Sequence, residues 1–177
     1  MENMKKYITQ VICYFWINPL RLAFLMSASL LGGAYAFQYI GGVEPCDLCW
    51  TQRYIHMAIL GLSAVGLLFK SPTCILRYIY TGFTTIALYI SSYAAGYHAG
   101  VEQKWWQGPT TCTSSGLNGG ASMDDLFESM MSAKLVLCDE IAWDMFGISM
   151  AGYNFLFSFG TALFVTLAMI DHFRKKT

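Results

Sequence analysis

The sequence predicts an all-α membrane protein in which four transmembrane helices form a bundle, joined on one side by two outward-facing loops. Its 177 residues, about one domain, are 55% hydrophobic and only 12% charged, whereas soluble proteins average roughly 25% charged residues. Four apolar segments, at about 22–40, 52–69, 78–101 and 145–170, approach or exceed the roughly 20 residues that a helix needs to cross a bilayer. Helices are expected because lipid offers no partners for exposed backbone groups.

The first segment, at 22–40, has no charged residue and is predicted to remain as a membrane helix. Basic residues near the N-terminus and an Ala-Tyr-Ala triplet ending at Ala36 imitate a secretory signal. The triplet lies beyond the usual reach of a signal, about 15 to 30 residues, and Pro19 and Arg21 interrupt the apolar run, so cleavage is not expected. Residues 7–20 are apolar but end at a proline, and we expect them to lie along the membrane surface.

The remaining segments follow in order. The second is somewhat short and is predicted to begin at the interface with Gln52 and Arg53, while the third and fourth can span the membrane with tilt. Loops at about 41–51 and 102–144 connect them on the outer side. In the longer loop, Ser122 and an apolar stripe at helical spacing predict a short amphipathic helix, resting on the membrane or packed on the bundle end: Met123, Leu126, Phe127, Met130 and Met131.

The basic residues predict the orientation. Eight of the eleven Lys and Arg residues fall on one side of the four segments: Lys5, Lys6, Arg21, Lys70, Arg77, Arg174, Lys175 and Lys176. Because basic residues are enriched on the cytoplasmic side of membrane proteins, both termini are predicted to be cytoplasmic in a multi-pass topology.

This topology sorts the six cysteines. Four lie in the outward loops: Cys46, Cys49, Cys112 and Cys138. Cys13 and Cys74 fall on the cytoplasmic side, where disulfides rarely persist, and we expect Cys13 to be a free, buried thiol and Cys74 to be reduced.

Cys46-Asp47-Leu48-Cys49 is a C-x-x-C motif directly before a predicted helix. Unpaired backbone N–H groups and the helix dipole stabilise thiolates at this position. If the helix includes Cys49, Arg53 four residues later lies on the same face and further favours the thiolate. An arginine at the rim of a bilayer also needs a partner.

Three interpretations of the outward cysteines compete. A redox relay is favoured because C-x-x-C bridges exchange readily, and a thiolate of one pair can attack the disulfide of the other. Inert structural bridges and a four-cysteine zinc site remain alternatives, although Cys112 and Cys138 are too far apart for a zinc knuckle. Haem attachment fails because Trp50 follows Cys49 where histidine is required. The chain has no nucleotide-binding motif, which favours a lipid-soluble electron acceptor held near Arg53.

Three stretches carry a family resemblance: Glu44-Pro-Cys-Asp-Leu-Cys-Trp-Thr-Gln-Arg53, Gly96-Tyr-His98 and Cys138-Asp-Glu-Ile-Ala-Trp-Asp-Met-Phe-Gly147. On these residues the chain resembles the DsbB-like disulfide bond formation proteins, of the general or the DsbI branch, over nearly its whole length, as one domain of residues 1–177. The resemblance implies an enzyme of the bacterial inner membrane. It would re-oxidise a periplasmic thioredoxin-fold oxidase, DsbA, and pass the electrons to ubiquinone or menaquinone.

The resemblance also implies roles for single residues. Cys112 would form the mixed disulfide with the partner and Cys138 would resolve it; Cys46 would exchange with Cys138, and Cys49 would engage the quinone. Arg53 would bind the quinone, and His98 either lines the same site or is a polar interfacial residue. No metal and no nucleic-acid partner are expected. The rival from another class is a non-enzymatic membrane scaffold or zinc-binding assembly factor with structural cysteines.

Overall fold

The computed structural model describes residues 2–69, 75–109 and 138–175. These residues form five helices and one two-stranded hairpin. The helices are α1 (Glu2–Ile17), α2 (Pro19–Tyr39), α3 (Asp47–Leu68), α4 (Ile75–Glu102) and α7 (Met150–Arg174), and the strands are β1 (Asp144–Met145) and β2 (Ile148–Ser149). The predicted all-helical class is confirmed.

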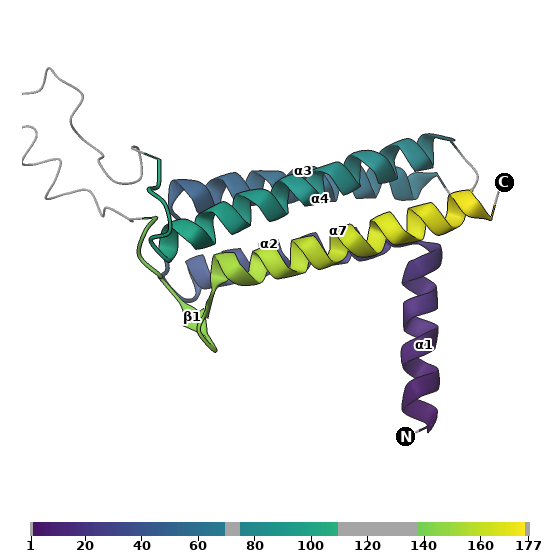
Figure 1. The fold of residues 1–177 in the computed structure, drawn as a ribbon, viewed down its shortest axis with the longest axis horizontal. Coiled ribbons are helices and arrows are strands. Elements are labelled where there is room, and N and C mark those ends of the chain that lie inside the picture. Colours follow the sequence, from purple (N-terminus) through teal and green to yellow (C-terminus); the bar gives the residue numbers. More distant parts are fainter. Residues whose placement is uncertain (1, 70–74, 110–137, 176–177) are drawn as a thin grey trace, which may run out of the picture.

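The four long helices lie side by side, and each runs in the direction opposite to the one before it (Figure 1). Helix α2 packs against α3 and α7, and α4 packs against the same two neighbours. Among the described helices, α2 and α7 are long and apolar enough to cross a membrane. That α3 and α4 cross it as well stays a prediction.

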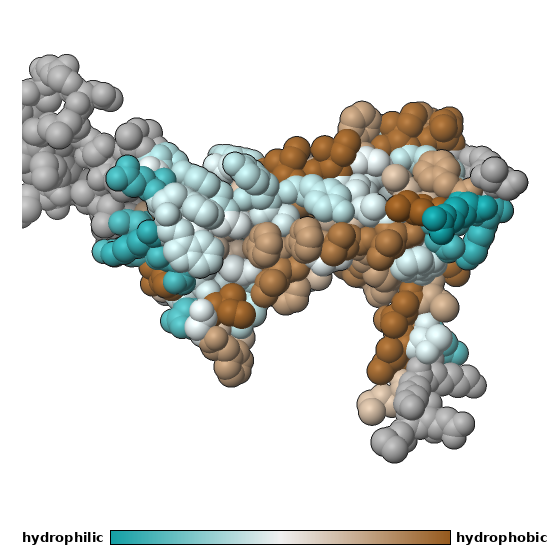
Figure 2. All heavy atoms as spheres, viewed as in Figure 1, coloured by the Kyte–Doolittle hydropathy of each residue, from teal (hydrophilic) through white to brown (hydrophobic). Residues whose placement is uncertain are grey.

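Small and polar side chains fill the interior of these four helices. Five of them are fully buried: Ser27, Ser63, Thr84, Ser91 and Ser158. Large apolar side chains such as Leu25, Phe83 and Phe159 are instead exposed, and Figure 2 shows hydrophobic side chains along the flanks and hydrophilic ones gathered at the ends. Small residues inside and apolar residues outside are typical of helices that pack within lipid.

Local sequence signals set the helix starts. Pro19 occupies the first turn of α2, where its missing N–H costs no hydrogen bond. The side chain of Cys46 caps α3 by accepting from the backbone N–H of Cys49, and the side chain of Ser149 caps α7 by accepting from that of Gly152. The C-x-x-C motif therefore lies at the N-terminus of α3, as the sequence predicted.

The fourth long helix begins at Met150, later than the predicted start near 145, because a hairpin precedes it. Strands β1 and β2 pair antiparallel, with Met145 opposite Ile148. The two residues between them, Phe146 and Gly147, have φ values of 54° and 75°. Positive φ at both positions is the geometry of a two-residue hairpin turn whose twist matches that of its strands.

Helix α1 projects sideways from the end of the bundle that carries the C-terminus (Figure 1). Trp16 anchors it there, donating a 2.9 Å hydrogen bond to Asp171 and packing edge-on against Phe164. Cys13 on α1 is free and exposed, so the prediction of a buried thiol is wrong: this helix has too few neighbours to bury it. Cys74, Cys112 and the predicted amphipathic helix lie outside the described residues.

Candidate functional site

A cavity of about 350 Å³ opens at the end of the bundle opposite α1. Its walls come from all four long helices and from the segment that precedes α7. Four of the sequence-predicted site residues line it: Cys46, Cys49, Arg53 and His98. Most of the other lining side chains are apolar, among them Phe37, Trp143 and Phe157.

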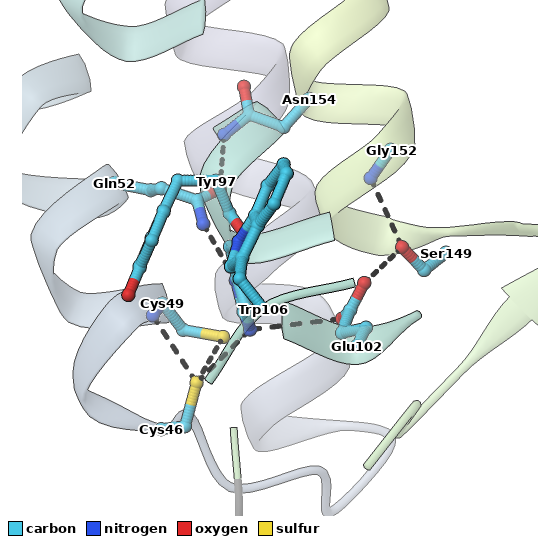
Figure 3. A network of polar contacts seen from close by, with 10 residues as sticks. Cys46, Cys49, Gln52, Tyr97, Glu102, Trp106, Ser149, Gly152 and Asn154 are labelled. Carbon is cyan, nitrogen blue, oxygen red and sulfur yellow. Dashed lines mark hydrogen bonds and ion pairs between the residues drawn. The ribbon is translucent and has the colours of Figure 1, made fainter. Parts of the chain in front are cut away.

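Cys46 and Cys49 are free thiols whose Sγ atoms are joined by a 3.1 Å hydrogen bond. The backbone N–H of Cys49 donates to Cys46 Sγ over 3.4 Å, and Nε2 of His98 lies 3.6 Å from the same sulfur. Three possible donors thus converge on Cys46 (Figure 3). Its position as the cap of α3 brings them together.

These contacts favour the negative charge on one sulfur of the reduced pair. The hydrogen bond from the Cys49 thiol lowers the pKa of Cys46 to about 4, against the opposing effect of burial and with further help from His98. The hydrogen bond to Cys46, together with burial, raises the pKa of Cys49 above its ordinary value. The sequence suggested the thiolate at Cys49; the contacts of the reduced pair favour it on Cys46, because the cap position collects the donors.

Cys138 lies in the same buried cluster as Cys46. Both pack with Val101 of α4, and Cys138 is only 1% exposed. Cys138 is disulfide-bonded, while Cys112 lies outside the described residues. A buried disulfide packed beside a low-pKa thiol is the arrangement that thiol–disulfide exchange requires.

Arg53 is buried at the cavity wall, one turn into α3 from Cys49. Its guanidinium donates to the side chain of Gln38 and, over 3.0 Å, to the backbone carbonyl of Ala34. It also lies 4.9 Å and 5.0 Å from the ring centroids of Tyr35 and Trp50. These neighbours supply the partners that a buried arginine needs, while Arg53 still lines the cavity.

His98 is buried and takes part in a polar network. Its Nδ1 lies 2.8 Å from Nε2 of Gln52, and its Nε2 lies 3.8 Å from Glu102. Glu102 accepts a hydrogen bond from Ser149, the cap of α7. Burial raises the pKa of Glu102, although the bond from Ser149 acts in the opposite direction.

Sequence reasoning missed Gln52, Glu102 and Asn154 as parts of this site, and gave His56 no role. All four line the cavity. A polar residue within an apolar segment was the signal that could have found Asn154 and His56, because such residues rarely face lipid.

The site also offers metal ligands. The donor atoms of Cys46, Cys49 and His98 lie within 4.8 Å of one another. A structural zinc ion takes four ligands, so within the described ranges this group is one short of that number.

Comparison with known proteins identifies the family. The family model "Disulfide bond formation protein DsbB" matches residues 18–168. Disulfide bond formation protein B of Stutzerimonas stutzeri is 30% identical over 80% of this chain and 87% of its own length. Disulfide bond formation protein B 2 of Pseudomonas syringae is 32% identical over 80% of this chain and 81% of its own. No solved structure matches. The matched range includes both the C-x-x-C motif and Cys138, the residues that meet at the site. The chain therefore belongs to the DsbB family of disulfide bond formation proteins.

Proposed function

We propose that this chain is a membrane thiol–disulfide oxidoreductase that re-oxidises a DsbA-like periplasmic dithiol oxidase and passes the electrons to a membrane quinone. One observation carries the proposal. The Cys46–Cys49 pair borders both the buried Cys138 and a largely apolar cavity at the bundle end. A dithiol with a disulfide on one side and an apolar chamber on the other is placed to pass electrons between them.

The exchange begins at Cys112, which lies outside the described residues. A thiolate of the partner attacks Sγ of Cys112, so that a partner–Cys112 bond forms, the Cys112–Cys138 bond breaks and Cys138 leaves as a thiolate. The second thiol of the partner then attacks the partner–Cys112 bond, which frees the partner as a disulfide and Cys112 as a thiolate. Cys138 attacks Sγ of Cys46 in the oxidised pair, so that a Cys138–Cys46 bond forms and the Cys46–Cys49 bond breaks. The electron pair leaves on Cys49. Packing of Cys46 and Cys138 in one buried cluster supports this step, since exchange requires direct contact between sulfur atoms.

Formation of the Cys46–Cys138 bond also changes the charge state of Cys49. In the reduced pair, the main cause of its raised pKa is the hydrogen bond to Cys46, and the negative charge of Cys46 adds to it. Once Cys46 is bonded to Cys138, that charge is gone. Cys49 can then hold the negative charge, which agrees with its proposed role as the residue that faces the quinone.

The cavity fits a quinone ring. Its walls are mostly apolar, as a flat carbon ring requires. Arg53 offers N–H groups to a ring carbonyl, and His98 lines the same wall beside Cys46. A bound quinone supplies an acceptor for two electrons and two protons. Arg53 would orient the ring, and the surrounding aromatic residues would exclude water. An acceptor of this kind is needed because a DsbA-type oxidase is itself strongly oxidising, with a reduction potential of about −120 mV.

We place the protein in the bacterial inner membrane as a four-helix transmembrane bundle with both termini in the cytoplasm. The basic residues near the termini support this orientation. The hydrophilic side chains at both ends of the structure support a bundle that spans the membrane (Figure 2). The cysteine pair and Cys138 would then face the periplasm, where disulfides form.

The test is anaerobic quinone reduction by the purified protein in detergent, with a reduced DsbA-like partner, followed by ultraviolet absorbance. Cys49→Ser and Cys112→Ser should abolish the reaction. Cys13→Ser is the matched control, because Cys13 is a free thiol on a helix at the opposite end. Cys49→Ser should still trap the partner at Cys112. Normal turnover in Cys49→Ser, or none in wild type with either quinone class, would refute the assignment, and zinc bound to the four cysteines would favour the scaffold alternative.

A further inference from the structure

A chain of buried polar side chains leads from the cysteine site into the bundle. It joins His98 of α4, Gln52 and His56 of α3, and Asn154 of α7. Nδ1 of His98 lies 2.8 Å from Nε2 of Gln52, Asn154 Nδ2 donates to Gln52 Oε1 over 2.6 Å, and His56 Nε2 lies 2.9 Å from Asn154 Oδ1. Figure 3 shows the part of this chain between Asn154 and the two cysteines.

Each member is at least nine-tenths buried. The exposed fractions are 3% for His98 and His56, 7% for Gln52 and 9% for Asn154. Buried polar groups cost free energy unless they are hydrogen-bonded, and apolar side chains would fill the same space at no such cost. The chain therefore needs a reason beyond packing.

The direction of each hydrogen bond follows from what the groups can donate. The oxygen of Gln52 accepts from the Asn154 amide, so the nitrogen of Gln52 is the atom that faces His98. An amide NH₂ group only donates, so Nδ1 of His98 is the acceptor. A neutral imidazole carries one N–H, and in His98 it must be on Nε2.

The far end of the chain holds Asn154 in this orientation. Asn154 Oδ1 accepts from Ser158 over 3.0 Å and faces Nε2 of His56. The hydroxyl of Ser27 lies 3.1 Å from Nδ1 of His56. In this arrangement Ser158 donates to Asn154 Oδ1, and the NH₂ group of Asn154 faces Gln52.

We propose that Gln52, Asn154 and His56 are positioning residues that hold His98 in the tautomer whose Nε2–H is directed at Cys46 Sγ. Nε2 itself lies 3.6 Å from Cys46 Sγ and 3.8 Å from Oε1 of Glu102. In this tautomer Nε2 of His98 donates to the thiolate of Cys46 and cannot accept a hydrogen bond itself. The inference rests on the proposed function only in taking Cys46 as the redox-active thiol.

The proposed variants leave in place the ionisable groups that face Cys46. Cys49 is on α3 and His98 and Glu102 are on α4, and each contributes to the cavity along with Glu44, Arg53 and Glu140. A change in Cys46 reactivity in these variants therefore reports the orientation of His98.

The first experiment reads the tautomer directly. Full-length protein labelled with ¹⁵N-histidine is reduced in detergent micelles, and the ring ¹⁵N chemical shifts of His98 are assigned by loss of its signals in His98→Gln. We expect the Nε2-protonated tautomer in wild type. The Nδ1-protonated tautomer would overturn the inference. The tautomer itself is read on the wild-type protein, and His98→Gln serves only to assign the signals.

The second experiment measures the pH dependence of Cys46 alkylation, resolved by mass spectrometry, in wild type and Asn154→Leu. Releasing the Gln52 amide should mix the tautomers of His98 and raise the pKa of Cys46 by about one unit, as expected for one lost hydrogen bond to a charged group. Ser63→Ala is the matched control, because Ser63 is buried on α3 and its hydroxyl donates to carbonyls of its own helix. His56→Gln, which can still donate to Asn154, should act like wild type and His56→Leu like Asn154→Leu.

An unchanged alkylation profile in folded Asn154→Leu would refute the positioning role. Neither readout requires a quinone or a partner protein. A protein that fails to reduce quinone but keeps the Nε2 tautomer would thus contradict the proposed function and leave this inference standing, and the reverse result would separate them equally well.

Discussion

At the scale of single residues, the reduced cysteine pair should react asymmetrically. The thiolate is the nucleophile, and the pKa of Cys46 is lowered to about 4 while that of Cys49 is raised. Cys46 should therefore be alkylated at least about tenfold faster than Cys49 at pH 6. Its reactivity should persist down the pH scale and be lost only as the pH falls through the lowered pKa. Peptide-resolved alkylation with iodoacetamide measures both rates, and the urea-unfolded protein, in which the two thiols should react alike, is the control.

Arg53 should not tolerate replacement by lysine. A lysine keeps the charge, but it lacks the planar group that donates to both Gln38 and Ala34 and lies over two aromatic rings. We expect Arg53→Lys to raise the KM for quinone about tenfold, the effect of losing roughly 1.4 kcal/mol of binding free energy. Quinone titrations of the reduction rate measure this. Gln38→Leu, which removes one bond and keeps the guanidinium, should have a smaller effect, and an unchanged KM in Arg53→Lys would argue against quinone binding at this residue.

The residues of the site divide into those that the sequence could predict and those that it could not. Cys46 and Arg53 belong to one short motif, so their chemistry is visible in local spacing. Gln52 and Asn154 lie on two different helices and are 102 positions apart in the sequence, yet their side chains are hydrogen-bonded. Such pairing depends on how the helices rotate about their axes, which apolar composition leaves undetermined.

At the scale of elements, the hairpin before α7 contains a strained residue. Phe146 has a positive φ and its side chain is 89% exposed. Left-handed backbone costs most side chains about 1 kcal/mol or more, and asparagine tolerates it better. Phe146→Asn should therefore raise the free energy of unfolding by about 0.5–1 kcal/mol. Thermal unfolding in detergent measures the change. Gly147→Val should lower the melting temperature, and a lower melting temperature in Phe146→Asn would contradict this account.

This hairpin also shows why helix boundaries were the weakest part of the sequence prediction. Residues 145–149 are mostly apolar, so they merge with the following helix when only hydropathy is considered. The turn lacks the Asn-Gly or Asp-Gly pair that usually marks such hairpins. The cap of α3 was predictable, by contrast, because its chemistry resides in the motif itself.

At the scale of the whole molecule, charge and hydropathy act on different parts of the fold. Composition predicts the helical class because lipid permits little else. The interior, however, is built from serine, threonine, histidine and asparagine, with a small apolar cluster of Ala23, Ile59, Leu88, Ala162 and Val165 at its centre. The exterior is richer in large apolar residues than the interior. Hydropathy therefore predicts where the helices are but not which of their faces pack together.

The orientation of the whole molecule gives the last prediction. Helix α1 and the C-terminus lie at the end opposite the cysteine site (Figure 1), so a cytoplasmic N-terminus requires a periplasmic site. Cys13 is exposed on α1, and Lys104 is exposed just beyond α4 at the other end. In intact spheroplasts, a membrane-impermeant maleimide should label Lys104→Cys, and should label Cys13 only after the membrane is permeabilised. Mass spectrometry identifies each labelled peptide. Labelling of Cys13 in intact spheroplasts would place the cysteine site in the cytoplasm, where disulfides rarely persist and a periplasmic oxidase could not reach it.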